Sequence, residues 1–117
     1  MEDQRVQWRL LTVNTAPERA TRLIGRMVEV LKDQYDIEHV GNCENIDEVL
    51  LKVTKYRPNV IFCASMWTPE QANTVFTTAK SVVPDIKTHA VPTGLQVQRG
   101  PDAVVEYLVE EVPKLLG

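Results

Sequence analysis

The stretch Val60-Ile61-Phe62-Cys63-Ala64, VIFCA, is an unbroken apolar run between Pro58 and the polar segment that begins at Ser65. A strand whose two faces are both covered by helices has this pattern, whereas a strand with one wet face alternates. We therefore expect residues 60–64 to form a central strand of a parallel sheet. The next residues, Thr68-Pro69-Glu70-Gln71, predict a helix start with a capping threonine, an early proline and a glutamine three positions after the cap.

On both sides of this strand, short apolar runs alternate with segments of helical periodicity. The pattern predicts strands at residues 10–13, 37–40, 60–64 and 86–91, each followed by a helix. Strands separated by helices pair in parallel through right-handed crossovers. The predicted fold is a flavodoxin-like, three-layer α/β/α doubly wound parallel sheet with four or five strands and about four helices. Whether residues 94–100 form a loop or carry a fifth, edge strand at Leu95–Val97 stays open. Thr15 and Glu18 predict a capping box for the first helix.

Composition limits the kind of protein this is. The 117 residues, 1–117, suit a single domain, and 44% hydrophobic with 25% charged residues is typical of a globular chain. The net charge of -3 argues against a nucleic-acid partner. No apolar run is long enough for a membrane span, and the first residues have no apolar signal core, so we expect a cytoplasmic protein. Two cysteines allow at most one disulfide and no metal motif.

The candidate site lies where parallel strands of such a sheet end. Ligands and partners of doubly wound sheets bind at the carboxyl ends of the strands, beside the first strand. Trp67 at that edge either covers the end of the sheet or anchors a partner, because exposed aromatic residues concentrate binding energy. Ser65 has neither the G-x-S-x-G elbow nor an identified base, so we predict no catalytic residue and lean against an enzyme. The predicted partner- or ligand-binding residues are Asn14, Thr15, Ser65, Met66, Trp67, Thr93 and Gly94.

Residues 36–69, DIEHVGNCENIDEVLLKVTKYRPNVIFCASMWTP, resemble the middle of a response-regulator receiver domain. The resemblance follows the family's order of apolar positions and turn residues without a gap. Residues 83–87, VPDIK, also resemble the start of the family's fourth strand. The resemblance implies a signalling domain with a protein partner, and it leaves a homodimer open. Between Thr93 and Pro101 there is too little chain for the family's fourth helix, which is part of its usual dimerisation surface.

The chemistry of the family does not carry over to this chain. Receivers hold magnesium with an acidic pair after the first strand, where this chain has Asn14 and Thr15. They phosphorylate an aspartate at the end of the third strand, where Ala64 stands here, and their lysine before the last helix is missing. Thr93 matches the family's switch hydroxyl. The resemblance therefore implies a pseudo-receiver: a non-catalytic regulatory and protein-interaction module that signals independently of phosphorylation and needs no cofactor.

A weaker resemblance leads to cobalamin-binding domains of the same architecture. Gly41 and Ser65-Met66-Trp67 are similar to the "G … S-x-L" pattern of that family. Its cobalt-ligating D-x-H-x-x-G motif is replaced by NTAPER at residues 14–19, which contains no histidine. This resemblance implies the alternative function, a small-ligand or corrinoid-binding domain or subunit of a larger enzyme, with cobalamin as the alternative cofactor.

Overall fold

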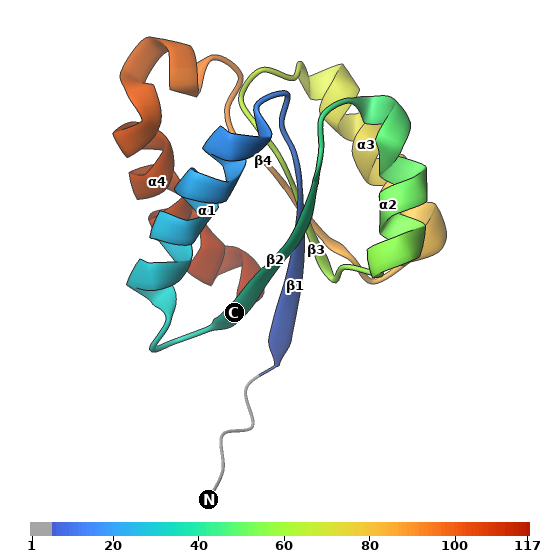
Figure 1. Ribbon diagram of the computed structural model, residues 1–117, viewed down its shortest axis with the longest axis horizontal. Helices are drawn as coiled ribbons and strands as arrows, with labels where there is room; N and C mark the ends of the chain where they lie inside the picture. The colour runs from blue at the N-terminus through green and yellow to red at the C-terminus, as the bar shows by residue number, and fades with distance from the viewer. Residues whose placement is uncertain (1–5) are drawn as a thin grey trace, which may run out of the picture.

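Four strands form one parallel sheet in the computed structural model, which describes residues 6–117. They are β1 (Gln7–Val13), β2 (Asp36–Cys43), β3 (Val60–Cys63) and β4 (Lys87–Ala90), in the order β2-β1-β3-β4. The helices are α1 (Pro17–Leu31), α2 (Val49–Tyr56), which follows a short 3-10 turn at Ile46–Glu48, α3 (Pro69–Val82) and α4 (Leu95–Leu116). Helices α1 and α4 cover one face of the sheet and α2 and α3 the other (Figure 1). The predicted three-layer α/β/α fold is confirmed.

The sheet has a separate hydrophobic core on each face. Phe62 of β3 packs in the core under α1 and α4, while its neighbours Ile61 and Cys63 pack in the core under α2 and α3. All four residues of β3 are buried. Burying one such large apolar side chain stabilises the fold by about 1.5–3 kcal/mol. The unbroken apolar run in the sequence is explained by this position between two helical layers.

The helix starts differ from each other in how they are capped. Thr68 forms the predicted capping box of α3: its hydroxyl accepts from the Gln71 amide at 3.1 Å, and the Gln71 side chain accepts from the Thr68 amide at 2.9 Å. The capping box predicted at Thr15 is wrong, since Thr15 is exposed and α1 has no side-chain bond at its N-cap. Asn14 supplies the oxygen instead, because its short side chain reaches the Ala16 amide two residues on, at 2.8 Å.

The segment after β4 turns directly into helix. Residues Leu95–Val97, offered as a possible fifth strand, belong to α4, so the described part of the sheet has four strands. Hydrogen bonds from the Gly94 amide to the Ser65 carbonyl (2.8 Å) and from the Gln98 amide to the Gly94 carbonyl (2.9 Å) bend the chain away from the sheet edge. A kink at Gly100, with φ of 84°, divides α4. Within residues 6–117, no helix has the length and apolar composition that a membrane span requires.

Candidate functional site

Asn14 lies at the carboxyl edge of the sheet, where β1 ends next to β3. Its amide donates to the Cys43 carbonyl at 2.8 Å, while the Ala64 amide donates to the Val13 carbonyl at 3.1 Å. The Asn14 side chain is 5% exposed, and its main-chain carbonyl accepts from Asn42 Nδ2 at 3.0 Å. Asn14 and Ala64 thus follow directly on neighbouring strands, at the same edge of the sheet.

Ser65 connects the end of β3 to the start of α4. It is 5% exposed, its carbonyl accepts from the Gly94 amide at 2.8 Å, and its Oγ accepts from the Gln96 amide at 3.1 Å. None of the hydrogen bonds of Ser65 within the described chain involves a histidine or a carboxylate. The Ser65 hydroxyl therefore acts in holding the loop, and the arrangement gives it no base.

Trp67 closes the same edge from the α2 and α3 side. Its indole Nε1 donates to the Val13 carbonyl at 2.8 Å, and its ring packs against the core on that face. The Thr93 hydroxyl donates to the Trp67 carbonyl at 2.7 Å. These contacts make Trp67 a half-buried cover of the sheet end, while its predicted role as an anchor for a partner stays a prediction. Thr93 itself is exposed beside it.

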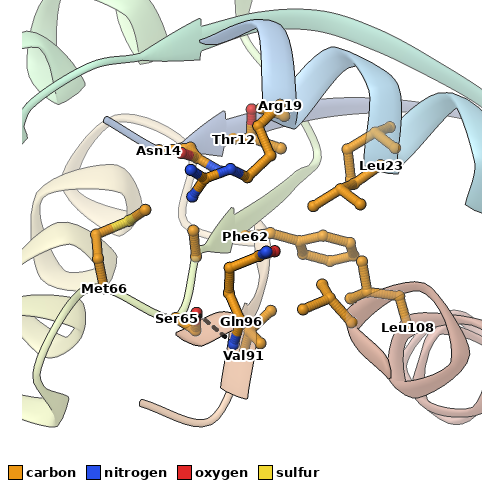
Figure 2. A pocket seen from close by; sticks show the side chains of 14 residues that line it. Thr12, Asn14, Arg19, Leu23, Phe62, Ser65, Met66, Val91, Gln96 and Leu108 are labelled. Atoms are coloured by element: carbon orange, nitrogen blue, oxygen red, sulfur yellow. Dashed lines mark hydrogen bonds between the residues drawn. The ribbon is translucent and has the colours of Figure 1, made fainter. Parts of the chain in front are cut away.

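A cavity of about 40 Å³ lies on the other side of the strand ends, between α1 and α4 (Figure 2). Three of the predicted site residues, Asn14, Ser65 and Met66, line it. The other four, Thr15, Trp67, Thr93 and Gly94, lie around the edge of the sheet and not in the cavity wall. The structure therefore brings the predicted residues to one end of the molecule but divides them between a cavity and a loop surface.

The sequence missed two residues that define this cavity, Arg19 and Gln96. In the sequence, Arg19 falls in one row with Arg22 and Arg26, a pattern typical of the solvated face of a helix. Its guanidinium turns instead toward Asn14 and the strand ends (Figure 2). Its place in the first turn of α1, three residues after the Ala16 cap, is the sequence feature that could have indicated a position near the strand ends. Nothing in the sequence indicated that Gln96 would line a cavity, because its segment was interpreted as a strand or a loop.

The electrostatics of the cavity are those of a single positive group among neutral ones. No aspartate, glutamate or histidine is among the described residues that line it, and Arg19 is the charged residue there. In the part of the chain that the structure describes, no three His, Cys, Asp or Glu side chains cluster so as to hold a metal ion. The neighbouring Thr12 hydroxyl bonds to His39 Nε2 at 2.8 Å, and burial lowers the pKa of His39. The arrangement suits a small anion better than a cation.

No protein-family model and no curated protein sequence matches this chain. Among solved structures, it is similar to the isolated REC domain of RcsB from Salmonella enterica serovar Typhimurium, at 11% identity and a TM-score of 0.53, over 88% of this chain and 72% of that one. It is also similar to a response regulator from Desulfuromonas acetoxidans, at 15% identity and a TM-score of 0.54, over 94% of this chain and 99% of that one. These similarities show that the chain has a receiver-like fold.

Proposed function

We propose that this domain is a regulatory module of the pseudo-receiver kind, which binds a protein partner without catalysis and without being phosphorylated. The observation that carries the proposal is the pair formed by Ala64 and Asn14 at the ends of β3 and β1. A methyl group cannot accept a phosphoryl group. The Asn14 side-chain oxygen is already engaged by the Ala16 amide, just before α1.

The charge at this edge also opposes metal-dependent phosphorylation. Magnesium is held in proteins by carboxylate oxygens, and the described lining of the cavity offers none. The guanidinium of Arg19 adds a positive charge at the same place (Figure 2). Like charges repel strongly at a partly buried site, so a divalent cation is disfavoured there.

A partner surface is available on the loops around the cavity. Thr15 after β1 and Thr93 after β4 are exposed, and Trp67 lies between their loops at the sheet end. The Trp67–Val13 and Thr93–Trp67 hydrogen bonds hold these loops in one arrangement. A preorganised surface loses less entropy on binding, which favours recognition by a protein.

The first test is phosphorylation of the whole chain. The protein is incubated with acetyl phosphate and magnesium and its intact mass is measured, with an active receiver domain treated in parallel. We expect no mass gain on this protein and a phosphoryl adduct on the control. A phosphoryl adduct on this chain would refute the proposal.

The second test addresses the partner surface. A photo-crosslinking amino acid is placed at Thr15 or Thr93 in cells, and at the exposed Asp33 after α1 as the control, which lies at the opposite end of the strands. We expect one protein to be captured from both loop positions and not from Asp33. Equal capture from all three positions, or none, would contradict an interaction site at the strand ends.

Corrinoid binding stays a prediction from the weaker resemblance. A histidine ligand to cobalt would have to come from His39 or His89. Their Nε2 atoms are bonded to the Thr12 hydroxyl at 2.8 Å and to the Tyr107 hydroxyl at 2.6 Å. We found no contact among the described residues that favours this alternative over the pseudo-receiver.

A further inference from the structure

The cavity between α1 and α4 has two chemically different halves (Figure 2). One half is polar and lies at the strand ends, where the side chains come from the residue after β1, from α1, from the loop after β3 and from the start of α4. The other half is apolar and lies deeper between the helices. The polar residues are Asn14, Arg19, Ser65 and Gln96, and the apolar ones include Leu23, Phe62, Val91 and Leu108.

Three polar groups of the first half have no partner in residues 6–117. Gln96 Oε1 is buried and accepts no hydrogen bond. The guanidinium of Arg19 makes no ion pair or hydrogen bond with another described residue, and Asn14 Nδ2 donates to none, although Asn14 is 5% exposed. Gln96 Oε1 is the buried one of these three groups, and buried polar groups are nearly always hydrogen-bonded in native proteins. An acceptor and two donor groups thus face the same small space with their capacity unused.

We propose that this cavity binds a small 2-hydroxy carboxylic acid with a short apolar side chain. The carboxylate pairs with the Arg19 guanidinium and the Asn14 amide, because guanidinium and carboxylate form strong charge-assisted hydrogen bonds. The 2-hydroxyl donates to Gln96 Oε1. The apolar side chain lies against Leu23 and Phe62. A 2-amino acid fits less well, since its ammonium would sit beside Arg19 with no carboxylate of the lining to neutralise it.

The size of the cavity limits the apolar part of the ligand. The enclosed volume of about 40 Å³ accommodates about three water molecules by this measure, fewer atoms than the whole acid has. In this proposal it therefore receives the apolar side chain alone, and the carboxylate and hydroxyl lie at the polar residues of the strand ends. An ethyl or isopropyl group fills that space, while a long alkyl chain does not fit. The ligand would connect α1 to the first segment of α4, which Ser65 already holds through the Gln96 amide at 3.1 Å. The inference goes beyond the proposed interaction role and does not depend on it.

The test uses the full chain and four probes: 2-hydroxybutyrate, 2-aminobutyrate, butyrate and inorganic phosphate. Binding is measured by calorimetry, and NMR follows the side-chain amide signals of Asn14 and Gln96. We expect 2-hydroxybutyrate to bind best and to shift both amides. Butyrate should bind roughly tenfold more weakly, because it leaves Gln96 Oε1 unpaired. Phosphate binding as tight as 2-hydroxybutyrate would overturn the proposal in favour of an inorganic anion site.

Two variants locate the binding. Arg19→Gln should weaken 2-hydroxybutyrate roughly tenfold to hundredfold, the range expected for a charge-assisted hydrogen bond. Arg22→Gln is the matched control, since Arg22 is exposed one turn further along the same helix and should bind as the wild type does. An equal loss in both variants would mean general charge attraction and would overturn the site.

A chain-length series decides the matter without any substitution. The wild-type protein is titrated with 2-hydroxybutyrate, 2-hydroxyisovalerate and 2-hydroxyoctanoate. We expect the first two to bind and the third to lose most of the affinity, because its tail exceeds the cavity. Tighter binding of 2-hydroxyoctanoate would indicate an apolar surface site. No binding of any acid at about 10 mM would show that the cavity has no specific affinity for these acids. Either result would overturn the proposal.

Discussion

Trp67 and Val13 are joined by a hydrogen bond from the indole Nε1 to the main-chain carbonyl, over 2.8 Å. The same carbonyl also accepts from the Ala64 amide at 3.1 Å. Val13 is fully buried at the end of β1, so if the indole moved away this carbonyl would keep its bond to the Ala64 amide but have no partner for its second lone pair. The bond therefore holds the loop after β3 against the end of the first strand, at the edge where the candidate site lies.

Trp67→Phe should destabilise the fold by about 1–2 kcal/mol, because an aromatic ring is kept but the indole N–H that bonds the Val13 carbonyl is lost. Urea unfolding followed by circular dichroism measures the change. Trp8→Phe is the control, since the Trp8 indole donates no hydrogen bond within the described chain and should lose less. Equal losses in the two variants would show that ring size and not the hydrogen bond matters.

Asn14→Ala should cost about 0.5–2 kcal/mol, because the Ala16 amide at the start of α1 loses its acceptor. Asn14→Asp keeps an oxygen at that place and adds a negative charge near a helix N-terminus, which is favourable. We therefore expect Asn14→Asp to retain most of the stability in the same urea experiment. A loss as large as that of Asn14→Ala would mean that the amide nitrogen, and not the cap, is the important group.

Acidification below about pH 6.5 should destabilise the protein. Burial lowers the pKa of His39 and of His89 below the ordinary value of 6.5. The unfolded chain then binds more protons than the folded one as pH falls through 6.5, so the stability contributed by the neutral histidines is present above pH 6.5 and decreases toward their lowered pKa values. Urea midpoints between about pH 7.5 and 5.5 measure this loss.

The double variant His39→Gln, His89→Gln is the control for that pH dependence. It removes both imidazoles while keeping side chains that can hydrogen-bond to Thr12 and Tyr107. We expect its stability to change less over the same pH range. An unchanged slope would assign the effect to other groups.

Both thiols should be unreactive in the native protein. Burial raises the pKa of Cys43 to about 11 and that of Cys63 to about 12, and the thiolate is the reactive form. Iodoacetamide at about pH 8 should modify neither cysteine in buffer and both in urea, as read by intact mass. Rapid labelling of Cys43 alone would reveal an opening at the end of β2.

The two cysteines do not form the one disulfide that the sequence allowed. Both are free, and they lie in register with Val13 on opposite sides of β1. Two strand spacings separate them, roughly 9–10 Å, which exceeds the reach of a disulfide. The sequence limited the number of disulfides, but the strand order decided that there is none.

Much of the fold was predictable because its signals are local. The apolar run at residues 60–64 reports burial on both faces, and Thr68 with Gln71 reports a helix start within four residues. The prediction was wrong where the same few residues were compatible with more than one local structure. At Thr15 a neighbouring asparagine reached the helix end instead, and at Leu95–Val97 weak alternation was compatible with helix, strand or loop.

The sequence by itself determined the alternation of strands and helices, and with it the parallel sheet and the edge where a site would lie. Through its resemblance to receivers, it also predicts that Ala64 and Asn14 replace that family's carboxylates. Only the tertiary structure decided that Arg19 and Gln96, 77 positions apart in the printed numbering, face one cavity. The physical reason is that caps and burial patterns act over a few residues, whereas this cavity depends on how α1 and α4 pack on the same face of the sheet.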